Sequence, residues 1–191
     1  MNIDELKILL IESLNVTYVT DSHLYVNNLC ERSKVFRIGL ILSQKIGDNQ
    51  EYAGYIVDSE YNKRGSLEKI ITGKYAQYPD LLLHKRGDNP DENLLVVEFK
   101  VSSTRLDKDP FENDVEKLKY LTDNNEYHYR LGAHVCLCPS GYIVKWYMSG
   151  SAESGFTSYS KNDGQMIPEQ SANDIVNSDF RKRYNKMESA R

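Results

Sequence analysis

The alternation of apolar and polar residues predicts two paired strands in the middle of the chain. Residues 94–101 form an apolar run of strand length, which follows the turn-rich sequence GDNPDEN. Residues 79–84 form a similar run, and we expect the two runs to pair through the turn between them. Because side chains alternate across a strand, Glu98 and Lys100 share one face of the later run. Charges on an otherwise apolar face are typical of a strand whose end leaves the core for a cleft.

Helical spacing of apolar residues marks three other segments, residues 3–14, 28–45 and 109–122. The third begins with Asp109 and Pro110, a common signature of a helix start. The remaining segments predict strands or loops. We expect strands at 55–60, 132–138 and 142–148, and loops at 15–27, 62–77 and 149–164, the last with room for a strand near 156–159.

These elements predict an α/β fold in one domain, because 191 residues suit a single sizeable core. We expect a mixed sheet of roughly five strands with helices on both faces. Residues 1–27 should form an N-terminal helix and loop that cover the core as a lid. Residues 28–148 should form the core itself, and residues 149–191 a C-terminal extension.

The formal net charge of −4 provides no global basic field for nucleic acid. A protein that acts on nucleic acid needs only a local basic track, so this charge does not exclude that class. No apolar run approaches membrane-spanning length, and residues 1–14 carry acids rather than a secretory signal. The three cysteines, an odd number, argue against a disulfide framework. We therefore expect a cytoplasmic protein with no membrane partner.

Asp80 begins the first of the paired runs, which would place its carboxylate beside Glu98 on the neighbouring strand. Two adjacent carboxylates repel each other unless a cation joins them. Magnesium prefers oxygen ligands, so Asp80, Glu98 and the backbone carbonyl of Phe99 predict an open Mg2+ site, with Mn2+ as a substitute. Lys100 would hold the attacking water and stabilise developing negative charge. The alternative is that Glu98 and Lys100 are solvated charges with cross-strand partners.

The residues Pro79 and Asp80, followed by Glu98, Phe99 and Lys100, resemble the motif of the PD-(D/E)xK nuclease superfamily. The resemblance implies a restriction-endonuclease-like core and metal-dependent hydrolysis of phosphodiester bonds. It favours an endonuclease, and DNA over RNA. The sequences NLCERSKVFRI and HKRG also resemble a group of uncharacterised small bacterial and phage members. Because members often dimerise, the resemblance leaves a homodimer open.

Glu31 lies at the start of the apolar stripe of the helix predicted at 28–45. A carboxylate on a core-facing line needs a partner. The resemblance implies that Glu31 reaches the metal site directly or through water. The alternatives are an acid favoured by the helix dipole, or one paired with Lys34.

Several basic residues are candidates for contacts with nucleic-acid phosphates. They are Lys63, Arg64, Lys74, Arg86, Lys117, Arg181, Lys182 and Arg183. For Lys117 the resemblance implies a place at the scissile phosphate, and the alternative is a surface lysine paired with Asp114. The others may equally be read as solvated charges. A catalytically silent nucleic-acid-binding or regulatory module on the same fold is the second function hypothesis, and a structural or partner-binding protein is the third.

Overall fold

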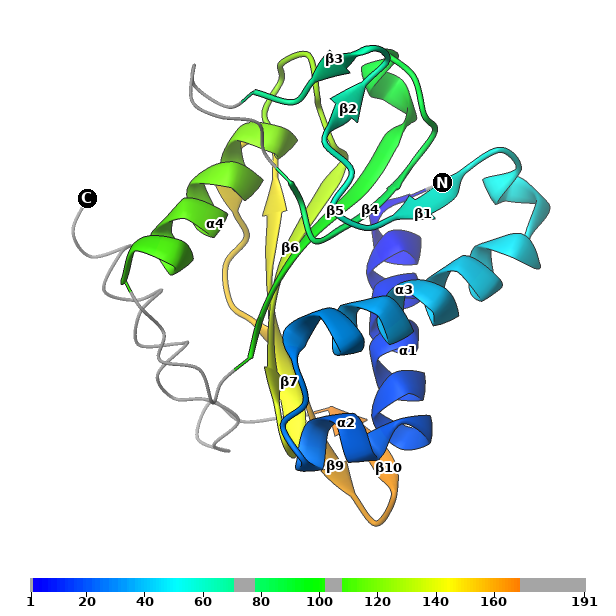
Figure 1. Ribbon diagram of the computed structural model, residues 1–191, viewed down its shortest axis with the longest axis vertical. Coiled ribbons are helices and arrows are strands. Elements are labelled where there is room, and N and C mark those ends of the chain that lie inside the picture. The colour runs from blue at the N-terminus through cyan, green and yellow to red at the C-terminus, as the bar shows by residue number, and fades with distance from the viewer. Residues whose placement is uncertain (1, 71–77, 102–107, 169–191) are drawn as a thin grey trace.

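The computed structural model of the protein describes residues 2–70, 78–101 and 108–168, without the side chains of residues 108–110. Its centre is an eight-stranded mixed sheet with the order β1-β4-β5-β6-β7-β9-β10, in which β8 also pairs with β7 (Figure 1). The strands are β1 (Ile56–Asp58), β4 (Leu81–His84), β5 (Asn93–Val101), β6 (Leu131–Cys138), β7 (Gly141–Met148), β8 (Ser151–Ala152), β9 (Thr157–Asn162) and β10 (Gln165–Pro168).

The two runs expected to pair do so, because β4 and β5 are antiparallel neighbours with Leu81 opposite Val97. β6 lies on the other side of β5 and runs parallel to it. A parallel pair needs a long crossover connection, and helix α4 (Lys108–Thr122) lies in that connection. The strand with Glu98 therefore lies inside the sheet, between β4 and β6.

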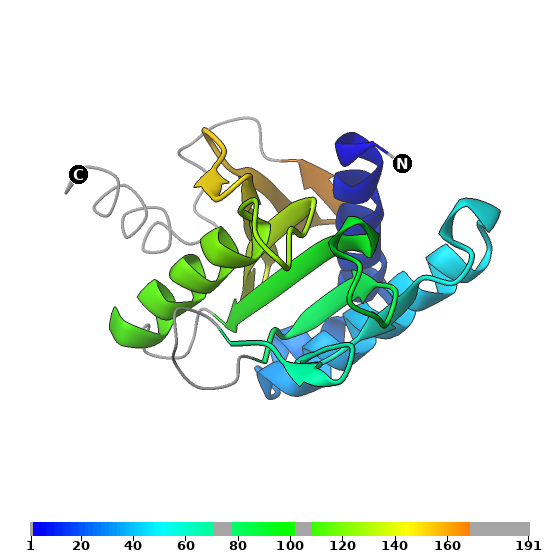
Figure 2. The same cartoon turned by 90° about the horizontal axis from the view of Figure 1, so that it is seen from above.

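Helices cover both faces of the sheet (Figures 1 and 2). On one side lie α1 (Ile3–Thr20), α2 (Ser22–Val26) and α3 (Glu31–Gly47), whose apolar stripes pack on Leu95, Val97 and Phe99. On the opposite side α4 packs on Val96 and Cys136. Strand alternation explains this division, because neighbouring residues of β5 point to opposite faces. The α/β class and the two-sided helix cover are as predicted.

The segment predicted as a loop at 15–27 is helical instead, as α1 continues to Thr20 and α2 follows. Its polar and β-branched residues have low helix propensity, but tertiary contacts outweigh that preference. The Tyr18 hydroxyl donates hydrogen bonds to the carbonyls of Cys138 and Gly141, at 2.8 and 2.6 Å. The Tyr18 ring also stacks on Tyr25, with 3.7 Å between ring centroids. These contacts anchor the end of α1 to the turn between β6 and β7.

The predicted sheet of roughly five strands is also too small, because the segment after residue 148 supplies β8, β9 and β10. β9 and β10 form a hairpin around Asp163 and Gly164, which have positive φ angles of 47° and 80°. An Asp-Gly pair is a strong hairpin signal, because a type I′ turn needs positive φ at both central positions. The serine-rich composition of the segment concealed this signal.

Three smaller features complete the described fold. β2 (Lys63–Arg64) and β3 (Leu67–Glu68) form a separate two-stranded hairpin. Two short 3-10 helices, η1 (Gln50–Tyr52) and η2 (Pro90–Glu92), precede β1 and β5. None of the helices within the described ranges combines the length and apolar character needed to cross a membrane.

Candidate functional site

Asp80 lies just before β4 and is fixed against the neighbouring strand. Its Oδ2 accepts a hydrogen bond of 2.7 Å from the backbone N–H of Phe99. Burial raises the pKa of Asp80 above its usual value, although the Phe99 hydrogen bond and the positive charges of Lys117 and Lys100 oppose this. The proximity of both lysines shows that Asp80 lies in the same charged cluster as Glu98 and Lys100 of β5. The predicted use of the Phe99 carbonyl as a ligand stays a prediction.

Glu98 is the most deeply buried carboxylate of this cluster, with 1% of its surface exposed. Its Oε2 accepts a hydrogen bond of 2.9 Å from Lys117 Nζ. Its Oε1 is buried and has no hydrogen-bond partner among the described residues. Burial raises the pKa of Glu98 well above its usual value, and the Lys117 charge only partly opposes this. Nearby Asp80 raises that pKa further, so the two carboxylates lie close enough to repel each other.

Lys100 shares its strand face with Glu98 and points to α4, where its Nζ lies 2.5 Å from Asp114 Oδ2. Burial alone would lower the pKa of Lys100, but the charge and hydrogen bond of Asp114, together with the charges of Glu31 and Asp80, outweigh burial and the pKa is raised. Lys100 therefore stays protonated at neutral pH. Asp114 also lies 3.8 Å from Lys117 Nζ, one helical turn further along α4.

Glu31 joins the same cluster from the first turn of α3. Burial raises the pKa of Glu31, and the negative charge of Asp80 raises it further. Opposing effects come from the Lys100 charge and from a hydrogen bond with the backbone of Val101, at the end of β5. The alternative partner, Lys34, lies 3.5 Å from Asn28 Oδ1 instead. The structure thus brings Glu31, Asp80, Glu98 and Lys100 together, although they are distant in sequence.

Solvent reaches this cluster through a pocket of about 270 Å³ between α3 and the segment before β4. Its lining includes Glu31 and Asp80. Glu60 also borders the pocket, but its carboxylate pairs with Arg32 at 3.2 Å, and both side chains are exposed. The pocket is large enough for water and for part of a ligand. Two of its carboxylates, those of Glu31 and Asp80, have raised pKa values.

The donor set suits a hard divalent cation such as Mg2+ in part. No group of three or more histidine, cysteine, aspartate or glutamate side chains within the described ranges is arranged to hold a metal ion. Magnesium, however, often binds through one or two carboxylates and completes its shell with water and phosphate. The buried, unpaired Oε1 of Glu98 beside Asp80 provides such a pair. Among the described residues, four carboxylates and two ammonium groups meet here, so these side chains carry excess negative charge when all are ionised.

Two more members of this cluster come from α4: Asp114, which was not predicted at the site, and Lys117, which only the resemblance placed there. The alternative of a solvated surface position for Lys117 is wrong, since its side chain is 13% exposed and its closest partner is Glu98, at 2.9 Å. Its predicted pairing with Asp114 is present, at 3.8 Å. Asp114 was considered only as that partner, yet it binds Lys100. The available signal was that both flank Val115 and Leu118 on the helix face predicted to be buried. Asp114 and Lys117 reach the site because α4 crosses over β5. The spacing of apolar residues within one helix or strand does not predict how two elements cross.

Of the predicted phosphate-binding residues that the structure describes, Lys117 alone lies in this cluster. Arg86 binds Asp58 through two hydrogen bonds of 2.6 and 2.9 Å, and Asp58 also lies 3.1 Å from His84 Nε2. Lys63 pairs with Glu68 on its own hairpin, at 3.3 Å. Arg64 lies over the Tyr127 ring, 6.0 Å from its centroid. The predictions for Lys74, Arg181, Lys182 and Arg183 fall outside the described residues.

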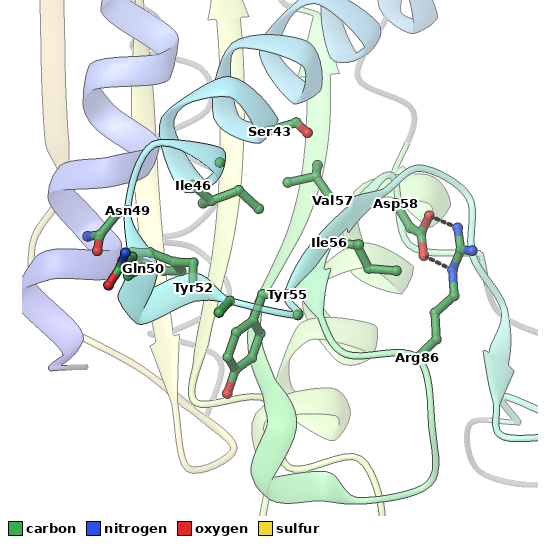
Figure 3. A pocket seen from close by; sticks show the side chains of 13 residues that line it. Ser43, Ile46, Asn49, Gln50, Tyr52, Tyr55, Ile56, Val57, Asp58 and Arg86 are labelled. Carbon is green, nitrogen blue, oxygen red and sulfur yellow. Dashed lines mark hydrogen bonds and ion pairs between the residues drawn. The ribbon is translucent and has the colours of Figure 1, made fainter.

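A larger pocket of about 490 Å³ lies elsewhere, between the end of α3, η1 and β1 (Figure 3). Asp58 and Arg86 lie together at one edge of it, joined by two hydrogen bonds (Figure 3). Both oxygens of Asp58 are used by Arg86 and His84, so these charged groups satisfy one another. We therefore place the candidate site at the smaller pocket, where buried charge remains uncompensated.

Two comparisons with known proteins give no relative whose site could be set beside this one. No model of a protein family matches the chain, and no curated protein matches it significantly. We therefore infer the function of the protein from the residues of the cluster and from their sequence resemblance to the PD-(D/E)xK motif.

Proposed function

We propose that the protein is a magnesium-dependent nuclease with a restriction-endonuclease-like core, which hydrolyses phosphodiester bonds of DNA. The observation that carries the proposal is the buried carboxylate of Glu98 next to Asp80, because one Glu98 oxygen has no hydrogen-bond partner among the described residues. An ionised buried carboxylate is costly unless it is compensated, and a divalent cation compensates two at once. The ExK residues lie on β5 and the PD residues just before the adjacent strand β4, and this placement, with helices on both faces of the sheet, supports the proposed fold.

Asp80 and Glu98 would hold the cation, with Glu31 in direct contact or bound through water. Asp80 is suited to this role because Phe99 holds only its Oδ2. Glu31 is suited because it lines the same solvent-accessible pocket as Asp80. The metal supplies Lewis-acid polarisation of the phosphate and lowers the pKa of bound water. Mn2+ should replace Mg2+, because it also accepts oxygen ligands in octahedral sites.

Lys100 acts in this proposal as a hydrogen-bond donor rather than as a base. Asp114 raises its pKa, so the amine is an ammonium that cannot accept a proton from water. An ammonium can orient the attacking water and stabilise the additional negative charge on the phosphate oxygens. In the reaction, the water oxygen bonds to phosphorus and its proton passes to solvent water. The bond from phosphorus to the leaving sugar oxygen breaks, and that oxygen takes a proton from solvent.

The proposal predicts cleavage that depends on both the metal and the cluster. We would incubate the protein with single-stranded, duplex and branched DNA and with RNA, in the presence of Mg2+ or Mn2+. Wild type should cleave at least one DNA substrate only with the metal. Asp80→Asn and Lys100→Ala should each reduce the rate by about a hundredfold or more, the scale for loss of a group that stabilises the transition state. Gel analysis of end-labelled substrates measures both rate and position.

Glu116→Gln is the matched control, because Glu116 lies on α4 but is exposed to solvent. It should cleave at the wild-type rate. Cleavage that persists unchanged in both Asp80→Asn and Lys100→Ala would show that the activity arises elsewhere. Cleavage of RNA alone would retain the chemistry and change the substrate class.

A second candidate is a catalytically silent nucleic-acid-binding or regulatory module on the same fold. The specific observation in its favour is that Lys100 and Lys117 are already paired with Asp114 and Glu98. In such a module these ion pairs have a purely structural role: they hold α4 against the sheet. This module would bind DNA in a gel-shift assay with equal affinity in wild type and Lys100→Ala, and it would cleave nothing.

A further inference from the structure

The buried ammonium of Lys117 contacts Glu98, a carboxylate that the proposed function assigns to the metal. Its Nζ lies 2.9 Å from Glu98 Oε2 and 3.8 Å from Asp114 Oδ1. Its side chain is 13% exposed and that of Glu98 is 2% exposed. Water therefore screens this ion pair poorly, and its charges act strongly on any other ion nearby.

Glu98 is only half used by this pair. Oε2 binds Lys117, whereas Oε1 is buried with no hydrogen-bond partner in the described part of the chain. A cation that binds Oε1 would share one carboxylate with the Lys117 ammonium. The bound cation and the Lys117 ammonium would then lie on the two oxygens of one carboxylate, and in surroundings of low polarity two positive charges so close together repel each other strongly. Lys100 contributes less to this repulsion, because Asp114 compensates its charge directly.

We propose that Lys117 is an internal counter-cation, which compensates Glu98 in the metal-free protein and weakens the binding of a divalent cation at Asp80 and Glu98. This inference rests on the proposed function. It explains how the chain can fold with Glu98 buried before any metal binds. It also makes Lys117 a positioning residue, because it acts on the metal through Glu98. A Lys117 ammonium released from Glu98 is then a free donor for a phosphate oxygen.

The direct test is the affinity for Mn2+ in the absence of nucleic acid, from the electron paramagnetic resonance signal of free Mn2+. Lys117→Met removes the charge and retains an apolar side chain of similar length. It should bind Mn2+ at least about tenfold more tightly than wild type, which corresponds to about 1.4 kcal/mol. Lys117→Arg retains the charge and should bind as weakly as wild type. Lys119→Met, which removes a charge from the same helix, should also match wild type.

Equal or weaker Mn2+ binding by Lys117→Met would overturn the proposal, as would no Mn2+ binding by either protein. Thermal unfolding shows whether each variant is folded. If Lys117→Met does not fold, Lys117→Gln takes its place, because glutamine keeps a hydrogen-bond donor without the charge. The same tightening is expected of Lys117→Gln, and its absence would count against the counter-cation.

This test separates the inference from the nuclease proposal. Wild-type cleavage that depends on Mg2+, combined with equal Mn2+ affinities, would overturn the role of Lys117 alone. Tighter Mn2+ binding by Lys117→Met, without cleavage of any nucleic acid by wild type, would support the counter-cation and overturn the nuclease.

Discussion

At the scale of single residues, the carboxylates of the candidate site cost the folded protein stability. Burial raises the pKa of Asp80, Glu98 and Glu31, which means that the folded state binds their protons more tightly than the unfolded chain does. For each group, stability is therefore greatest below its unfolded pKa and is lost as the pH rises through the raised value. Sites that retain such a cost are commonly functional.

Asp80→Asn should consequently stabilise the protein at pH 7. The asparagine carbonyl can still accept the hydrogen bond from Phe99, while the negative charge that burial disfavours is gone. We expect a gain of about 0.5–2 kcal/mol in the free energy of unfolding at pH 7, measured by urea denaturation. The gain should shrink as the pH falls through the raised pKa of Asp80, because the wild-type carboxyl then becomes neutral as well.

Asp58→Asn provides the opposite case for the same measurement. Burial alone would raise the pKa of Asp58, but hydrogen bonds from Arg86 and His84 outweigh it and the pKa is lowered. Loss of this charge should destabilise the protein at pH 7. An Asp80→Asn variant that loses stability as Asp58→Asn does would show that Asp80 is a structural acid.

At the scale of elements, the buried side chain of Lys69 holds the β2–β3 hairpin to the chain segment just before it. It follows β3 and is 1% exposed. Its Nζ donates hydrogen bonds to the carbonyls of Tyr61 and Lys63, at 3.2 and 2.8 Å, and lies 4.7 Å from the centroid of the Tyr61 ring. Burial lowers the pKa of Lys69 to about 8. The hairpin is thus held by an ammonium that burial disfavours.

Lys69 should make stability depend on pH in the alkaline range. Between about pH 8 and the unfolded pKa of 10.5, the unfolded chain binds the Lys69 proton and the folded protein releases it. The contribution of Lys69 to stability therefore rises with pH across this window, by up to about 1.4 kcal/mol per pH unit. Lys69→Met should lack this rise when the two proteins are compared by urea denaturation from pH 7 to 10. Identical slopes would show that Lys69 titrates normally.

Elements were predictable where their own residues determine them. The alternation in β5 was sufficient to place Glu98 and Lys100 on one face, and the Asp109–Pro110 signature was sufficient to start α4. The continuation of α1 to Thr20 was not predictable, because it depends on the contact of Tyr18 with the β6–β7 turn. For the same reason the partners of Asp114 and Lys117 were not predictable, since the packing of α4 on the sheet determines them.

At the scale of the whole molecule, the cluster lies where four elements meet. Glu31 comes from α3, Asp80 from the start of β4, Glu98 and Lys100 from β5, and Lys117 from α4. Helices from opposite faces of the sheet thus contribute to one site at the end of β5 (Figure 1). The α/β class followed from the sequence of strand and helix patterns. The number of strands did not, because β8 to β10 come from a segment whose composition suggested a loop.

The central claim is that Asp80 and Glu98 share one divalent cation, and diffraction from crystals grown with Mn2+ and a short DNA duplex tests it most directly. We expect an anomalous Mn2+ peak within about 2.5 Å of oxygens from both carboxylates, with water and phosphate as further ligands. We also expect that Lys117 has moved away from Glu98 Oε2. The account would be contradicted by a structure with DNA bound, no peak between Asp80 and Glu98, and the Lys117–Glu98 pair still in place.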